Sequence, residues 1–123
     1  LRDEKDKFFD DNHERMIFFN KGVLETVQKL GWAPDIIHCS GWMTSLIPLY
    51  LKKYYKHTAV FKESKVVYSA YEQQFSEQFP ADFMEKALME DVVAADLLPF
   101  AGLNDQAMNM GGIAYADAVV LAN

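Results

Sequence analysis

A short apolar run leads straight into a helical pattern in the stretch Pro34-Asp-Ile-Ile-His-Cys-Ser-Gly-Trp-Met-Thr-Ser-Leu-Ile-Pro-Leu-Tyr-Leu51. We predict a strand from Asp35 to Cys39, followed by a helix that Ser40 caps and that reaches about Tyr54. Pro48 lies inside that helix, so one backbone hydrogen bond is lost and a kink is expected. Polar residues gather at the strand-to-helix joint, and α/β proteins place their ligands at the carboxyl ends of sheet strands.

The rest of the chain alternates between helical and strand patterns. A helix from about Asn12 to Leu30 is predicted, with Asp11 and Glu14 forming a capping-box-like start and Gly31 closing its end. The remaining predicted elements are a strand from Lys65 to Tyr71, helices from Ala81 to Met89 and from an Asn104 cap to about Tyr115, and a strand from Ala118 to Ala122.

This order of elements predicts an α/β fold, a three-layer αβα Rossmann-like fragment with a mostly parallel sheet of about three strands. Such a sheet with exposed edges is small for an independent domain. We therefore expect residues 1–123 to be a single partial domain, which belongs to a larger sheet or pairs with a second copy as a homodimer. The start without Met, inside a charged run, also suggests an excised fragment.

Composition narrows the classes of function. Half of the residues are hydrophobic and the net charge is −6, so a core is expected and binding to nucleic acid is not. No apolar run is long enough for a transmembrane helix, and the charged N-terminal stretch does not resemble a signal peptide. The single cysteine, Cys39, fits a reducing compartment, and a cytoplasmic location is expected.

The sequence contains none of the general catalytic, phosphate-binding or metal-binding motifs. His38 and Cys39 are adjacent on a strand and point to opposite faces, so they make a poor metal pair, and neither a metal nor a cofactor is expected. Two interpretations of His38 stay open. It either bonds to a neighbouring loop, or it contacts a ligand at the carboxyl end of the strand.

The strand ends predict a site that contains Ser40, Trp42, Tyr71 and Glu72, because both ends lie at one edge of a parallel sheet. Three of these residues also have a purely structural interpretation. Ser40 is first a helix cap, Trp42 can pack under the adjacent loop, and Glu72 can be a solvated loop residue. The residues expected in the core include Phe75, Phe79, Phe83, Met108 and Met110.

Three ordered stretches, over about residues 11–122, resemble the N-terminal catalytic domain of bacterial glycogen synthases and plant-type starch synthases. They are Asn12-His-Glu-Arg-Met-Ile-Phe-Phe-Asn-Lys-Gly-Val-Leu-Glu25, then Pro34-Asp-Ile-Ile-His38 with Trp42 and Leu46-Ile-Pro-Leu-Tyr-Leu-Lys52, and Gly111-Gly-Ile-Ala-Tyr-Ala-Asp-Ala-Val-Val120. The sequence departs from the family at four places: Ser40-Gly41 replaces His-Asp, Met43 replaces a His, Tyr71 replaces a His, and Met110 replaces a Lys.

The resemblance implies a fragment of a retaining glucosyltransferase of the two-domain GT-B architecture. The parent would transfer glucose from ADP-glucose to an α-1,4-glucan acceptor, and the fragment alone would be inactive. Ser40, Gly41, Trp42, Tyr71 and Glu72 would then line the acceptor side of the cleft. A glucan-binding or regulatory module that has lost transfer is the second hypothesis. An unrelated flavodoxin-like interaction domain is the third, and it predicts that the Ser40 and Tyr71 edges do not converge.

Overall fold

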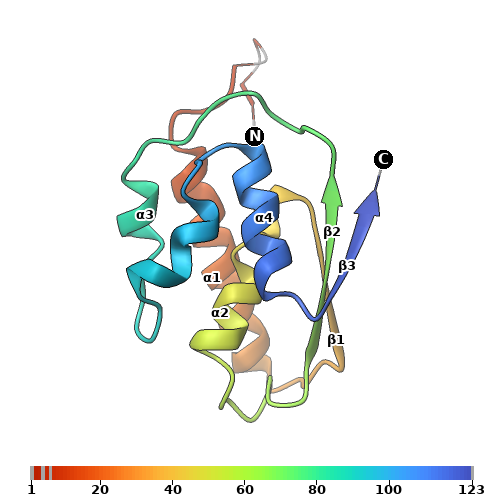
Figure 1. Cartoon of the computed structure of the whole chain (residues 1–123). Coiled ribbons are helices and arrows are strands. Elements are labelled where there is room, and N and C mark those ends of the chain that lie inside the picture. The colour runs from red at the N-terminus through yellow and green to blue at the C-terminus, as the bar shows by residue number, and fades with distance from the viewer. Residues whose placement is uncertain (1, 4, 6, 123) are drawn as a thin grey trace.

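The computed structural model describes residues 2, 3, 5 and 7–122, and the chain order of its elements is seen in Figure 1. The α-helices are α1 (Asn12–Leu30), α2 (Ile47–Lys53), α3 (Phe83–Lys86) and α4 (Asp105–Tyr115). Short 3₁₀ helices span η1 (Trp42–Thr44) and η2 (Ala94–Phe100). The strands are β1 (Ile36–Ser40), β2 (Lys65–Tyr71) and β3 (Ala118–Ala122). None of the helices in the described part is long and apolar enough to cross a bilayer.

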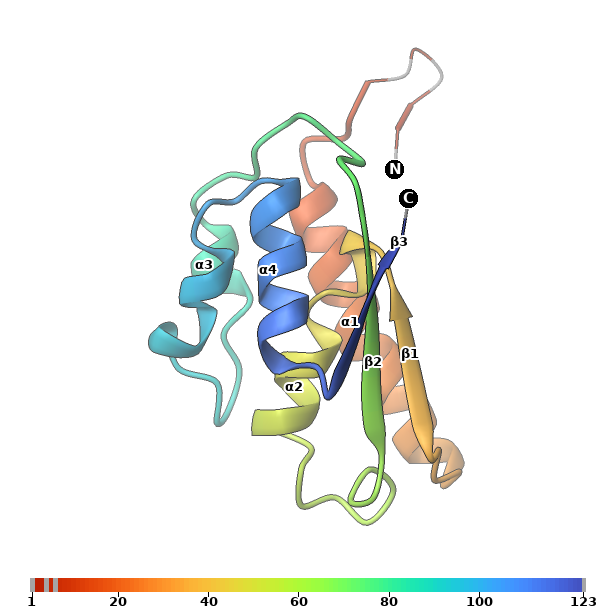
Figure 2. The same ribbon diagram turned by 45° about the vertical axis from the view of Figure 1, so that its right-hand side comes forward.

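The three strands form one parallel sheet, as predicted, and their order in it is β1-β2-β3. The register pairs His38 with Val67 and Ser40 with Ser69, while Tyr68 pairs with Val119. The helices lie on one face of this sheet (Figure 2). Of the three layers of an αβα arrangement, the described residues therefore supply the sheet and one helical layer. Ile36, on the uncovered face, is accordingly 65% exposed.

The segment that follows β1 differs from the prediction. β1 runs one residue further than expected, so Ser40 is its last residue and does not cap a helix. The 3₁₀ turn η1 comes next, and α2 begins separately at Ile47. Pro48 therefore lies in the first turn of α2, where its missing N–H costs nothing, and the expected mid-helix kink is absent.

The predicted limits of α1 are confirmed, but its predicted capping box is wrong. Asp11 makes no side-chain cap, because its Oδ1 accepts a 2.8 Å hydrogen bond from Arg15 Nε. Glu14 instead forms an ion pair with Lys86, 3.1 Å away. At the other end, Gly31 takes the left-handed conformation (φ +70°) that was expected of it.

The end of the chain matches the prediction more closely. Asn104 caps α4 by accepting a 2.8 Å hydrogen bond from Ala107 N–H, and the limits of β2 and β3 are as expected. The predicted helix from Ala81 to Met89 shrinks to the single turn α3. The segment after it, whose pattern is ambiguous in the sequence, contains η2.

Two glycines let α4 pack closely against its neighbours, the sheet and η2. A Cβ added to Gly112 would lie 2.6 Å from the ring of Tyr68 on β2, and one added to Gly111 would lie 2.1 Å from the ring of Phe100. Both rings are fully buried. The glycines that weaken α4 as a helix therefore allow its close packing, Gly112 against the sheet and Gly111 against η2.

We predict opposite effects for two glycine-to-alanine changes within helices. Gly112→Ala should lower the free energy of unfolding by about 1–3 kcal/mol, because the new methyl group overpacks against Tyr68. Gly22→Ala, in α1, meets no atom within 4 Å. It should raise the free energy of unfolding by about 0.5–1 kcal/mol, since alanine favours a helix. Urea denaturation of both variants measures these changes. An unchanged free energy of unfolding in Gly112→Ala would contradict the close packing of α4 on Tyr68.

Cys39 lies on the helix-covered face of β1 and is fully buried. Burial raises the pKa of its thiol to about 12, from an ordinary value of 9.0. The reactive thiolate is therefore very scarce at neutral pH in the folded protein.

Alkylation of Cys39 by iodoacetamide at pH 8 should accordingly be at least about a hundredfold slower in the folded chain than in urea. The rate is measured by mass spectrometry of the intact chain over time. Equal rates in both conditions would show that the thiol is accessible, in conflict with its place in the core.

Candidate functional site

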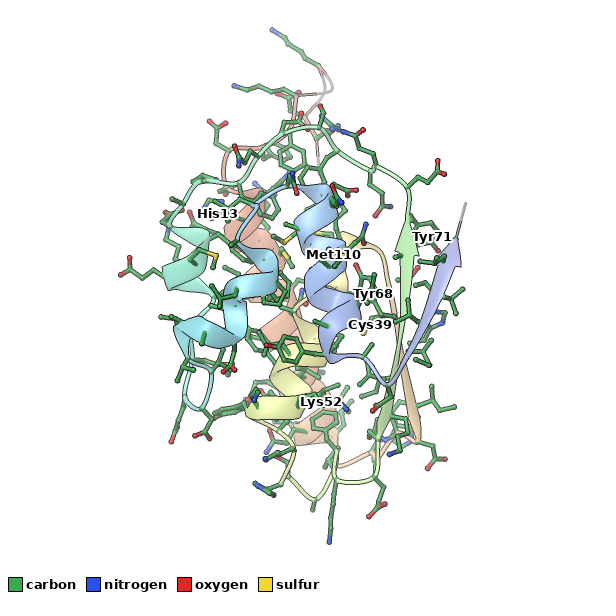
Figure 3. All side chains as sticks on the ribbon, in the orientation of Figure 1. His13, Cys39, Lys52, Tyr68, Tyr71 and Met110 are labelled. Carbon is green, nitrogen blue, oxygen red and sulfur yellow. The ribbon has the colours of Figure 1, made fainter. Side chains whose placement is uncertain are left out.

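The carboxyl ends of β1 and β2 meet through two hydroxyl groups. Ser40 Oγ and Tyr71 Oη lie 2.8 Å apart, within hydrogen-bonding distance, although the residues are 31 positions apart in the chain. Figure 3 shows Tyr71 at the carboxyl end of β2, beside the last part of β3. The strand ends thus meet at one edge of the sheet, as predicted for neighbouring parallel strands.

Gly41 forms the turn between β1 and η1. Its N–H donates a 3.0 Å hydrogen bond to Ser69 O, which ties the turn to β2. Its backbone has φ +81° and ψ 172°, a region that only glycine occupies readily. A Cβ at this position would also lie 3.1 Å from Gln74 Oε1. The turn is therefore built for glycine.

Gln74 covers the turn, a role that no sequence pattern indicates. Its Oε1 accepts a 3.3 Å hydrogen bond from Trp42 N–H. The loop after β2 therefore folds back over the loop after β1. Because residues in irregular loops carry no periodic pattern, only the tertiary structure reveals this contact.

Trp42 lies under the site rather than at its surface. The residue is only 7% exposed, and its ring packs against Phe8, Phe75 and Phe79, with the Phe75 ring centre 4.9 Å away. This placement agrees with the interpretation in which Trp42 packs beneath the adjacent loop. Phe75, Phe79 and Phe83 are buried, which confirms the expected apolar face.

A cavity of about 370 Å³ opens beside Tyr71, between the end of β2 and the start of α4. Glu72 lines it and is exposed, together with Gln73, Asp105, Gln106, Asn109 and Met110. Asn109 fixes the cavity wall, because its Oδ1 accepts a 2.8 Å hydrogen bond from Tyr68 Oη and its Nδ2 donates a 3.1 Å hydrogen bond to Tyr71 O.

Met110, at the rim of this cavity, corrects one expectation about the core. It is 51% exposed, whereas Met108 is fully buried. The two side chains are two positions apart on α4 and therefore point in very different directions. Only Met108 can face the sheet and the core.

Asp105 is a second site residue that the sequence analysis missed. It is the first residue of α4, is only 5% exposed, and its Oδ1 has no hydrogen-bond partner among the described residues. Burial raises the pKa of its carboxyl group, and a hydrogen bond from the Gln74 backbone opposes that rise. An acid just after a helix cap usually serves the helix dipole, so the sequence gives no sign of its burial in a cavity wall.

His38 and Cys39 lie on opposite faces of β1, as expected. His38 Nε2 lies 2.6 Å from Ser69 Oγ, so its partner is the neighbouring strand rather than a loop. The described residues contain no cluster of three or more His, Cys, Asp and Glu side chains arranged to hold a metal.

The side chains at this edge offer several groups that can form hydrogen bonds with a ligand. Ser40 and Tyr71 offer hydroxyl groups, Glu72 and Asp105 offer carboxyl groups, and Asn109 contributes an amide. None of these hydroxyl groups contacts a histidine or lysine base in the described part of the chain. Such a set suits a ligand rich in hydroxyl groups.

Comparison with known proteins identifies the family. The family model of the starch synthase catalytic domain matches residues 2–122. The glycogen synthase of Chlorobium luteolum (strain DSM 273 / BCRC 81028 / 2530) is 48% identical over 84 residues, which cover 68% of this chain and 17% of that protein. The glycogen synthase of Desulforudis audaxviator (strain MP104C) is 36% identical over 112 residues, which cover 90% of this chain and 22% of that protein.

A solved structure shows the same fold. The catalytic domain of starch synthase IV from Arabidopsis thaliana, bound to ADP and acarbose, superposes with a TM-score of 0.70 at 17% sequence identity. The match covers 91% of this chain and 23% of that one. The chain spans about a fifth of the length of these curated relatives. From the family match and the shared fold, we conclude that this chain belongs to the starch synthase catalytic domain family.

Proposed function

We propose that the protein containing this chain transfers glucose from a sugar nucleotide, ADP-glucose, to the end of an α-1,4-glucan. The family match and the glycogen synthase relatives support a glucosyltransferase of this kind. The observation that carries the proposal is the Ser40–Tyr71 contact, which joins the carboxyl ends of two parallel strands beside a cavity.

In this proposal the chain forms part of the wall that faces the glucan acceptor. Ser40, Tyr71 and Glu72 present polar groups to the sugar, while Gly41 keeps the turn low enough for the sugar to approach. Trp42 acts from beneath, because its buried ring supports the turn that carries them. The aromatic face of Tyr71 would stack on a glucose ring, and its hydroxyl group would bond to a sugar hydroxyl group.

The chain alone is proposed to be inactive. The described cavity is bounded on one side only, by β2, its loop and α4, and would leave a sugar nucleotide largely in solvent. Large apolar side chains are also exposed on the sheet and beyond α1, including Ile36, Leu121 and Trp32. We propose that further elements of a larger domain cover them, with a second copy of the chain as the alternative. A cytoplasmic location stays a prediction.

We predict that Tyr71→Ala in the full-length protein lowers kcat/KM for glucosyl transfer to glycogen by about tenfold or more, through loss of the ring and its hydroxyl group. Tyr71→Phe keeps the ring and should therefore lower kcat/KM by less than Tyr71→Ala does. Thermal denaturation of both variants serves as the control for folding. Transfer at the wild-type rate by Tyr71→Ala would remove this residue from the proposed acceptor wall.

A glucan-binding or regulatory module without transfer activity is the second candidate. One observation favours it: the backbone at Gly41 suits only glycine, at the position where the resembled family has an aspartate. The turn in this chain therefore does not readily accept the aspartate of that family.

Incubation of the full-length protein with labelled ADP-glucose and glycogen separates the two candidates. Under the transfer proposal, label enters the glycogen with the full-length protein and does not with the 123-residue chain alone. Sedimentation with glycogen but without incorporation of label, from either ADP-glucose or UDP-glucose, would instead support the binding module.

A further inference from the structure

A second cavity lies at the opposite end of the sheet from Tyr71. Its volume is about 200 Å³, and it is bounded by the end of α2, the loop before β2 and the residue before β3. Figure 3 shows Lys52 at this end of the molecule, away from Tyr71. The residues that line it are Leu51, Lys52, Lys56, Phe61, Lys62, Ser64, Lys65, Val66 and Asp117.

Four lysines line this cavity, although the chain as a whole carries a net charge of −6. Twelve lysine and arginine residues are present in all, so a third of them face one small space. A cluster of this kind in an acidic chain creates a local positive potential that can attract an anion.

The only carboxylate in the lining is Asp117, and it is already engaged. Its Oδ1 lies 2.6 Å from Lys52 Nζ, and its Oδ2 accepts a 2.8 Å hydrogen bond from Val66 N–H. Burial raises the pKa of this carboxyl group, but the hydrogen bonds from Lys52 and Val66 and the positive charges of Lys52 and Lys65 together outweigh the effect, so that the net pKa lies below its ordinary value. Asp117 is therefore ionised at neutral pH, and it neutralises Lys52.

The other three lysines form no ion pair like that of Lys52 among the described residues, although the positive charge of Lys65 also acts on Asp117. Lys56, Lys62 and Lys65 are exposed and form no ion pair within the part of the chain that the structure describes. All three line a space that is small for a nucleotide and large enough for a phosphate group with a short substituent. The positive charge of the lining therefore exceeds the single negative charge of Asp117.

We propose that this lysine-lined cavity is a binding site for a small phosphate-bearing anion, either inorganic phosphate or a small phosphomonoester. Ammonium groups bind phosphate oxygens through charge-assisted hydrogen bonds, and a dianion gains more than a carboxylate from several such groups. Leu51 and Phe61 close the apolar side of the cavity, which would favour an ester with a short carbon chain.

The site is separate from the proposed acceptor wall. Lys65 begins β2 and Tyr71 ends it, so the two sites lie about 20 Å apart along the strand. The inference does not depend on glucosyl transfer. Anion binding at this end can be present or absent whichever candidate function holds.

Isothermal titration calorimetry of the full-length protein with inorganic phosphate at low ionic strength tests the proposal. Saturable binding of phosphate that depends on the lysines of this cavity is expected. Lys62→Gln and Lys56→Gln should each weaken it by about fivefold to thirtyfold, since each removes one charged donor. Asp117→Asn should tighten it, because the competing carboxylate is lost and Lys52 is released.

Lys7→Gln is the matched control, since it changes the net charge equally in the N-terminal segment, at the end of the molecule away from the cavity, and should leave the affinity unchanged. Glycerol 1-phosphate forms the second arm. Tighter binding of the ester identifies a small phosphorylated metabolite as the ligand class, and tighter binding of phosphate identifies the free ion. Absence of saturable binding of both, or equal weakening by Lys7→Gln and Lys62→Gln, would overturn the site.

Discussion

The contact between the Tyr68 ring and the backbone of Gly112 holds the molecule in its observed arrangement. It sets how closely α4 lies on the sheet, and it places Tyr68 Oη against Asn109. Asn109 in turn bonds to Tyr71 O, so the end of β2 is held by the helix that packs on its middle. The cavity beside Tyr71 exists because α4 begins at this distance from the strand. A bulkier residue at position 112 would push the helix away from the sheet, and the cavity wall would move with it.

Much of this arrangement can be predicted from local patterns. The limits of α1, β2, α4 and β3 follow from their residue patterns and clear end signals. The limits of the elements after β1 do not, because a helical pattern cannot show that Ser40 extends a strand or that Pro48 lies at the start of a new helix. The convergence of Ser40 and Tyr71 follows from the rule for parallel strands. By contrast, the burial of Asp105 and the cover by Gln74 depend on how a loop folds back, which no pattern in the sequence encodes.

The structure also gives a physical reason for two of the family-like motifs. Lys52 is the last residue of the family-like stretch that contains Pro48. Asp117 belongs to the family-like stretch that contains Tyr115, and it is 65 positions from Lys52 in the chain. They meet in an ion pair, and Asp117 also bonds to the first buried residue of β2, Val66. Part of the resemblance therefore reflects how the fold is joined at the amino ends of β2 and β3. The departures at Ser40 and Gly41 lie at the other end, where the structure is organised around a turn built for glycine.

The central claim is that the carboxyl edge of β1 and β2 faces a glucan. A crystal structure of the full-length protein with a linear α-1,4-glucan oligosaccharide, such as maltohexaose, tests it most directly. The account predicts a glucose ring within hydrogen-bonding distance of Tyr71 or Ser40, beside the cavity lined by Asp105 and Asn109. An oligosaccharide bound in the interdomain cleft without any contact to this edge would contradict it.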